Sequence, residues 1–228
     1  MRRTALLAVA LWAMASGSAL ASGPVAPPPP YIAPVVPTTF DWSGGYIGLR
    51  LGAPLGENTW AERSIGAEST PDRWSGTLWG LSAGYDRQSG SMVYGAALDY
   101  TGGEIVGAST TSASFGCAGA CETHVENTLA IRGRVGRAFD RTLVYATAGF
   151  ATGNATARNP GGLPLGSDRL NGWTAGLGVE HALSDRFSIN LEYLFTDLGR
   201  LEIPASCTVN CYSDVSFGTI RLGANFRF

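Results

Sequence analysis

The sequence lacks any apolar run long enough to cross a membrane as a helix. The longest run, residues 4–15, covers roughly a dozen positions, whereas a spanning helix needs about 20. Arg2 and Arg3 precede it and small residues ending at Ala21 follow it, the pattern of a cleaved secretory signal peptide. We therefore expect residues 1–21 to be a signal peptide, with a retained helical anchor as the alternative, and the mature chain to have no transmembrane helix.

Positive charge is also scarce, and none of it comes from lysine. The chain has 16 basic and 18 acidic residues, a formal net charge of −2. Removal of residues 1–21 takes away two arginines and changes that charge to −4. Nucleic-acid-binding proteins carry a basic excess, so we expect no nucleic acid among the partners.

Residues that carry chemistry are few. The chain has 2 histidines and shows no Ser/His/Asp order, phosphate-binding glycine loop or cluster of metal ligands. We therefore expect no catalytic site, no cofactor site and no metal site, and no enzymatic activity. His124, expected near the outer mouth, leaves open a role in haem or metal binding beside an incidental polar role, whereas His181 is expected near the periplasmic interface.

Proline is concentrated in one segment. Residues 24–37 read PVAPPPPYIAPVVP, which cannot form a helix or the interior of a sheet and favours an extended polyproline conformation. We predict a periplasmic linker over residues 22–40. It is either a simple solvated spacer or a contact for peptidoglycan.

Apolar and polar residues alternate with a period of two along most of the remaining chain, which indicates β-strands with one apolar face. In the segment that ends at Phe228, for example, Ile220 and Leu222 alternate with Arg221 and Arg227 on the polar face. We expect eight strands, at about residues 42–52, 74–86, 92–100, 124–137, 143–152, 171–183, 187–196 and 214–228.

The connections between these segments alternate between long polar loops and short turns. Strands of roughly ten residues with this alternation are typical of an outer-membrane β-barrel, with long extracellular loops and short periplasmic turns. We predict an all-β, eight-stranded antiparallel transmembrane barrel over residues 41–228, in contact with outer-membrane lipid; a secreted β-sandwich is the alternative. Interfacial aromatic girdles are expected from Trp74, Tyr85, Tyr94, Tyr100 and Phe187.

The polar faces of the strands carry four arginines and four carboxylates. The interior of an eight-stranded barrel is just wide enough for side chains, so these charges are expected to pair and plug the lumen. A narrow ion path or an acid/base site of paired carboxylates remains the alternative. The predicted lumen charge network is Arg50, Asp99, Glu126, Arg132, Arg134, Glu180, Glu192 and Arg221.

Four cysteines form two CxxxC pairs, Cys117 with Cys121 and Cys207 with Cys211. An even number in an exported protein indicates disulfides. Three connectivities exist, and we favour the two local ones because the two loops are expected on opposite sides of the barrel mouth. A zinc site of four thiolates is the alternative, although the spacing is not a usual zinc pattern.

Several stretches resemble the opacity-like, porin-family outer-membrane β-barrel proteins of alphaproteobacteria, a group with surface antigens and hemin-binding proteins. They are DWSGGYIG from Asp41, GYDRQSGSMVYG from Gly84, RGRVGRAFDRTLVYATAGFA from Arg132, GWTAGLGVEHALSDRFSINLEYLFTDLG from Gly172, and the closing RLGANFRF. The resemblance implies a location in the outer membrane of a Gram-negative bacterium. It also implies recognition of the last strand by the barrel-assembly machinery, through Arg221, Gly223, Phe226 and Phe228.

These observations favour a structural, surface-exposed barrel that supports envelope integrity and has a lumen plugged by charged side chains. One alternative is a small-solute porin. Another is a surface protein whose extracellular loops bind hemin or a host ligand, since loops carry the specialised functions of a fold.

Overall fold

The structure, a computed structural model, describes residues 40–62, 66–110, 120–159, 161–203 and 211–228. The predicted signal peptide and all but the last residue of the predicted linker lie outside these residues, so both stay predictions. Within the described ranges no helix is long and apolar enough to span a membrane.

The described chain is built from β-strands, eight of which are long. The long strands are β1 (Gly44–Leu55), β5 (Thr70–Ser89), β6 (Met92–Thr110), β7 (Ala120–Phe139), β8 (Thr142–Arg158), β9 (Pro164–Ala182), β10 (Phe187–Ile203) and β11 (Cys211–Arg227). Three short strands lie between the first two: β2 (Glu57–Asn58), β3 (Trp60–Glu62) and β4 (Ala67–Glu68).

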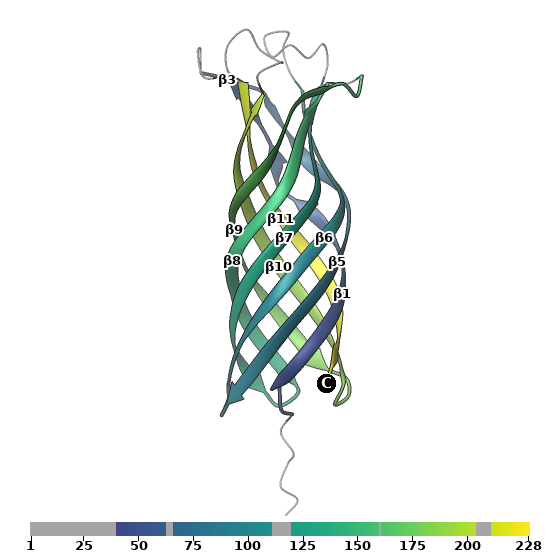
Figure 1. Cartoon of the computed structure of the whole chain (residues 1–228), viewed down its shortest axis with the longest axis vertical. Coiled ribbons are helices and arrows are strands. Elements are labelled where there is room, and N and C mark those ends of the chain that lie inside the picture. Colours follow the sequence, from purple (N-terminus) through teal and green to yellow (C-terminus); the bar gives the residue numbers. More distant parts are fainter. Residues whose placement is uncertain (1–39, 63–65, 111–119, 160, 204–210) are drawn as a thin grey trace, which may run out of the picture. The chain divides into compact units, whose positions relative to one another are not determined.

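The eight long strands form a closed antiparallel barrel. Each pairs with the next along the chain, and β1 also pairs with β11, from Tyr46 opposite Arg227 to Leu55 opposite Gly218. Figure 1 shows the strands tilted around a common axis. Closure leaves no sheet edge in the lipid-facing wall, which satisfies the backbone where water is absent. The predicted eight-stranded antiparallel barrel is confirmed.

Short turns gather at one end of the barrel, which we call the turn end; the opposite end, with the longer connections, is the loop end. Two of the turns are two-residue hairpins, between Ser89 and Met92 and between Phe139 and Thr142. Asp140 and Gly90 supply the positive φ angles, 54° and 60°, that such tight hairpins require.

Alternating residues place a belt of apolar side chains on the outside of the barrel. On β1 the outward residues Ile47, Leu49 and Leu51 are 53–66 % exposed, while the intervening Tyr46 and Arg50 are buried inside. Exposure of large apolar side chains on this scale is incompatible with water and fits lipid contact.

The strands continue well beyond the positions predicted from the sequence. Residues expected in loops, such as 101–110 and 153–158, extend β6 and β8 toward the loop end. There the pattern is reversed: outward side chains such as Asn154 and Asp214 are polar, while inward Ala155 and Val215 are apolar. In these segments the inward alanines and the outward polar residues differ little in size and hydrophobicity, so the sequence pattern resembles that of a loop.

Strand β1 ends earlier than its neighbours, and the chain that follows fills the gap. Strand β2 pairs with β5 at Asp72 and Arg73, and β3 pairs with β11 at residues 211–213. The Trp60 indole is fully buried and donates a hydrogen bond to Thr123 Oγ1, 2.9 Å away. The first long connection thereby pairs with both strands that flank β1 and packs into the loop end.

Candidate functional site: the charged interior

Two clusters of paired charges occupy the interior of the barrel. The central cluster consists of Arg50, Asp99, Arg132 and Glu192, from β1, β6, β7 and β10. Arg50 Nη1 lies 2.6 Å from Asp99 Oδ1, Arg132 Nε lies 2.9 Å from Asp99 Oδ2, and Arg132 Nη1 lies 3.0 Å from Glu192 Oε2. Side chains from opposite walls thus meet across the lumen.

The second cluster, which we call the turn-end cluster, consists of Asp86, Arg134, Glu180 and Arg227. Each arginine contacts both carboxylates. Arg134 Nε donates to Asp86 at 2.7 Å and Arg134 Nη1 to Glu180 at 2.9 Å. Arg227 Nη2 lies 2.9 Å from Asp86 and 3.1 Å from Glu180. The four charges therefore form a closed square in which each buried charge has two partners of opposite sign.

Aromatic and polar groups fill the remaining space around the clusters. The Arg134 guanidinium lies over the rings of Tyr46 and Tyr145, 4.8 and 5.2 Å from their centroids. The Tyr145 hydroxyl donates to Glu192 Oε2 at 3.1 Å and so joins the two clusters. All the charged side chains of both clusters are at most 5 % exposed. The interior at this level is packed.

Apolar layers lie on both sides of the charges. At the turn end, a group of buried side chains surrounds Trp42, whose ring is 4.7 Å from the Arg227 guanidinium carbon. This group contains Phe40, Trp42, Val93, Leu143, Tyr145 and Ala182. Toward the loop end, a larger cluster contains Trp60, Trp74, Leu198, Leu201 and Phe217 among its members. An ion that crosses the barrel would have to pass all of these layers.

Glu126 was wrongly assigned to the lumen network. Its side chain is 49 % exposed and lies 3.1 Å from Arg158 on the outer surface. The cause is a bulge in β7: Val125 pairs with Ala155 and Asn127 with Asn154, so Glu126 is an extra residue. A single extra residue reverses which face the following side chains occupy.

Arg221 lies inside the barrel, as predicted, but outside the ion-paired clusters. It is 6 % exposed and donates from Nε to Thr219 Oγ1 at 3.1 Å. No ion pair of Arg221 with another described residue is present. It borders a small cavity of about 10 Å³, shared with Arg50 and Thr101, which has room for about one water molecule.

Two residues of the turn-end cluster were not assigned to the network from the sequence. Asp86 was interpreted as the last residue of a strand before a turn, and Arg227 was placed only on the polar face. Both positions continue the period-two alternation of their strands, so that alternation alone predicts inward side chains there. Trp74, predicted in a girdle, is instead buried inside and donates to the Ser216 carbonyl at 3.0 Å.

The paired-carboxylate alternative gains no support from the geometry. Glu180 contacts Arg134 and Arg227, and it also accepts hydrogen bonds from Ser188 and Asn225 at 2.6 and 2.8 Å. Carboxylates held in this way by cations and donors are stabilised as anions, which does not suit a proton donor.

The two histidines lie at opposite ends of the barrel. His124 lies between Glu104 and Glu122, with its ring nitrogens 2.6 and 3.0 Å from their carboxylate oxygens. His181 contacts the Thr142 hydroxyl at 3.0 Å. Among the described residues no group of three or more metal-ligating side chains is suited to hold a metal ion.

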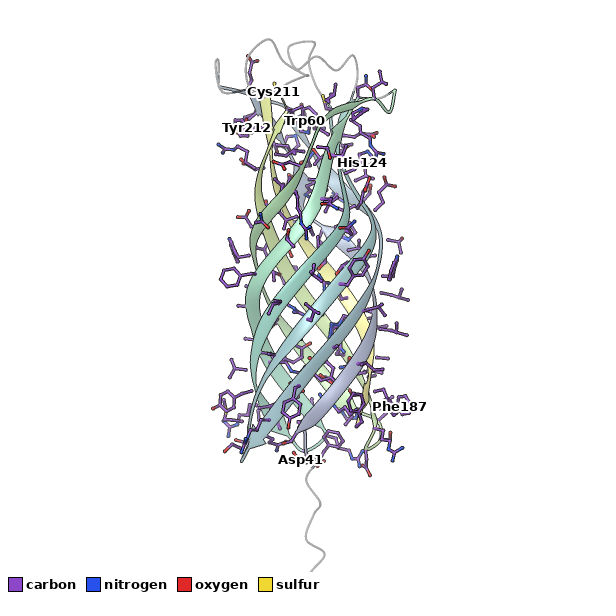
Figure 2. All side chains as sticks on the ribbon, viewed as in Figure 1. Asp41, Trp60, His124, Phe187, Cys211 and Tyr212 are labelled. Carbon is purple, nitrogen blue, oxygen red and sulfur yellow. The ribbon has the colours of Figure 1, made fainter. Side chains whose placement is uncertain are left out.

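The cysteines that the structure describes are both buried at the loop end, and Figure 2 marks Cys211 there near Trp60. Cys121 and Cys211 each take part in a disulfide bond. Cys117 and Cys207 lie outside the described residues, so the two local pairs stay a prediction. Of the predicted assembly signal, Arg221 and Gly223 face inward, while Phe226 and Phe228 line the outer surface at the turn end.

Comparison with known proteins identifies a family model and relatives that share most of this sequence's length. Residues 7–228 match the family model described as an outer membrane protein β-barrel domain. The 31 kDa outer-membrane immunogenic protein of Brucella melitensis is 36 % identical over 95 % of this chain and 96 % of its own length. A 22 kDa outer membrane protein of Rhizobium leguminosarum is 29 % identical over 72 % of this chain and 68 % of its own.

Solved structures with the same fold include two outer-membrane proteins. OprG of Pseudomonas aeruginosa superposes with a TM-score of 0.56 at 15 % identity, over 82 % of this chain and 96 % of its own. Neisserial surface protein A gives 0.51 at 18 %, over 82 % and 98 %. Barrels of this kind place short turns in the periplasm and long loops outside. The chain belongs to the outer-membrane β-barrel protein family, and it is an outer-membrane protein of the Gram-negative type.

Proposed function

We propose that the protein is a non-conducting, surface-exposed structural barrel that supports the integrity of the outer membrane. The observation that carries this proposal is the pair of buried charge clusters, each of which connects side chains from opposite walls of the lumen. Apolar layers lie on either side of them. The proposal includes an absence of catalysis, because the interior carboxylates are engaged by arginines.

The main competing function is a small-solute porin. A porin of this fold needs a continuous polar path of water width through the lumen. The Arg134 side chain contacts Asp86 and Glu180, and the neighbouring Arg227 contacts the same two carboxylates, which supports a lumen that these four side chains close. Moving them apart would leave buried charges unpaired, at a cost of about 3–5 kcal/mol for each broken pair.

Planar-bilayer conductance of purified, refolded protein tests the proposal. We expect no stable single-channel steps above those of a protein-free bilayer. Insertion is verified on the same sample by heat-modifiable migration on a gel and by protease resistance of the barrel. Reproducible steps of one conductance value from inserted protein would contradict the closed lumen and favour the porin.

A second candidate function is recognition at the cell surface. The strands extend beyond the apolar belt into a collar with outward polar side chains, among them Arg158, Glu202 and Asp214. The Brucella relatives are named immunogenic proteins. We propose that this collar and the connections above it are accessible to antibodies and to a host ligand or hemin, and that Cys117 and Cys207 form local disulfides that shape them.

Binding to intact cells tests the surface proposal. Antibodies raised against the folded barrel are expected to label unpermeabilised cells. Hemin or host-matrix binding that is lost in Cys117→Ser and Cys207→Ser, with the barrel still heat-modifiable, supports a role for the cysteine loops. Unchanged binding would exclude that role.

Assembly and anchoring complete the proposal. We propose that the barrel-assembly machinery recognises the last strand through Arg221, Gly223, Phe226 and Phe228, and that the linker spans toward peptidoglycan. Replacement of Phe228 by serine is expected to lower the amount of folded barrel in the outer membrane, measured by heat-modifiable migration. Normal folded amounts would contradict the assembly role of this residue.

A further inference from the structure

The outer surface of the barrel carries one pronounced apolar groove, of about 640 Å³. Its lining comes from β10, β11, β1, β5, β6 and β7, while β8 and β9 contribute nothing to it. The groove is recessed because the outward side chains at its base are the small Ala83 and Ala224. Leu49, Leu81 and Tyr100 form one of its walls.

The strand registers give the direction of the groove. One row of paired residues starts with Phe187, at the beginning of β10, and passes through Phe226 and Ile47 to Ala83 and Leu98. Phe187 lies at the turn end (Figure 2), whereas Leu98 lies six residues into β6. The groove therefore rises obliquely from the periplasmic rim toward the middle of the membrane.

The length of the groove fits one leaflet. The whole lining extends one strand further, to Leu129 on β7. The five steps between neighbouring strands, at about 4.8 Å each, make the groove roughly 24 Å long. With strands tilted by about 40°, the row across them climbs by roughly 15 Å, which is half of the hydrocarbon thickness of about 30 Å. An extended acyl chain of the periplasmic leaflet matches this depth.

A second, polar pocket of about 490 Å³ lies at the foot of the groove. Phe226 lines both, so the two are adjacent. The pocket is lined by Arg186 together with the carboxylates of Asp41 and Asp185. Arg227 also lines the pocket, but its guanidinium is paired with Asp86 and Glu180 inside the barrel. The outward charges are therefore Arg186, Asp41 and Asp185, the last of which lies 3.2 Å from Arg141. Charges of both signs next to an apolar groove complement a headgroup that carries both a phosphate and an ammonium group.

We propose that this composite site binds one zwitterionic glycerophospholipid of the periplasmic leaflet. One acyl chain lies in the groove over Ala83 and Ala224, and the phosphate contacts Arg186 while the ammonium group contacts Asp185 or Asp41. Loose annular lipid surrounds the whole belt, whereas this site holds a lipid at a defined place. The inference is independent of whether the lumen conducts.

Native mass spectrometry of the full barrel, released from vesicles of equimolar phosphatidylethanolamine and phosphatidylglycerol, tests the proposal. We expect one retained phosphatidylethanolamine molecule. Ala83→Phe fills the groove and is expected to lower its occupancy about tenfold, equivalent to about 1.4 kcal/mol. Ala148→Phe is the matched control, because Ala148 also points outward but lies on β8, away from the groove. It is expected to retain the lipid.

The headgroup end is tested separately. Arg186→Gln is expected to lower retention, whereas Arg137→Gln, which removes another exposed turn-end arginine, leaves it unchanged. Equal retention by the wild type, Ala83→Phe and Ala148→Phe would show annular lipid only and overturn the proposal. Equal retention of both lipids would overturn the zwitterionic headgroup. A dimer that is lost in Ala83→Phe would show that a second copy occupies the groove instead, which also overturns it.

Discussion

The interior of the membrane-embedded part and the interior of the loop end have opposite polarity. In the former, buried arginines and carboxylates face inward and apolar side chains face lipid. In the latter, Leu201, Val215 and Phe217 face inward, and Asp214 and Arg200 face water. The same strands thus form a barrel with a polar interior in the membrane and, continuous with it, a barrel with an apolar interior at the loop end. What surrounds the wall decides which face carries the charge.

Two devices switch the polarity. In β11 the inward parity never changes, and only the residue types do, from Arg221 and Asn225 to Val215 and Phe217. In β10 the parity itself reverses at a bulge, where Gly199 has a φ of +85°. Without that bulge Arg200 would point into the apolar layer. Strands whose charges fall on the wrong parity need an extra residue at the boundary.

The largest expected effect comes from breaking the turn-end cluster. Arg134→Met leaves Asp86 and Glu180 with one arginine between them, so we expect a loss of about 3–5 kcal/mol in the free energy of unfolding. Urea unfolding in lipid vesicles, followed by tryptophan fluorescence, measures it. Arg169→Met, on the outer surface at the loop end, is the control and is expected to cost less than about 0.5 kcal/mol.

The apolar interior at the loop end should respond to lost volume rather than lost charge. Leu198 is 1 % exposed, and Leu198→Ala is expected to cost about 2–4 kcal/mol through the cavity that it leaves. Leu191, on the same strand, faces lipid and is 52 % exposed, so Leu191→Ala should cost less than half as much. Equal costs for the two variants would refute a packed interior at this level.

The bulge at the boundary allows a smaller, local test. Gly199→Ala places a Cβ at ordinary van der Waals distance, 3.9 Å, from the Asn171 carbonyl oxygen but keeps a positive φ, so we expect a loss of about 1–2 kcal/mol from backbone strain alone. Gly133→Ala is the matched control, with similar space but without a positive φ, and is expected to be neutral or slightly stabilising. The urea unfolding midpoints of the two variants measure this difference. Equal midpoints would contradict a strained backbone at Gly199.

The smallest effect is expected at Glu126. Its contact with Arg158 is exposed, so Glu126→Gln should change the free energy of unfolding by less than about 0.5 kcal/mol. A loss of several kcal/mol would contradict the exposed position and indicate that Glu126 is buried in the lumen, as the sequence pattern predicts.

The strand periodicity was enough to predict the barrel, its strand number and its antiparallel pairing. Arg50, Asp99, Arg132, Arg134, Glu180 and Glu192 all lie inside, as their parity predicts. The prediction for Glu126 was wrong because it extended the period-two alternation of β7 past a bulge, and a bulge leaves no clear signal in one sequence. Asp86 was missed because it is the last residue of the predicted strand, and the alternation was not followed to that end.

The loop-end extensions could not be predicted for a related reason. In β8, inward Ala155 and Ala157 differ little in size from outward Thr156, so the alternation there is weak. Strand formation at this level depends on pairing with the neighbours, such as Asn154 with Arg169, and on closure of the barrel. Those interactions are tertiary and have no local periodic signature.

A double-mutant cycle on Arg132 and Glu192 tests the central claim, a closed and charged interior, most directly. Arg132→Met and Glu192→Gln, singly and together, are compared by urea unfolding in vesicles. The two side chains lie 3.0 Å apart and are at most 3 % exposed, so we predict a coupling energy of about 2–3 kcal/mol. A coupling energy below about 0.5 kcal/mol, the value of a water-exposed pair, would contradict the account and show an open, hydrated lumen.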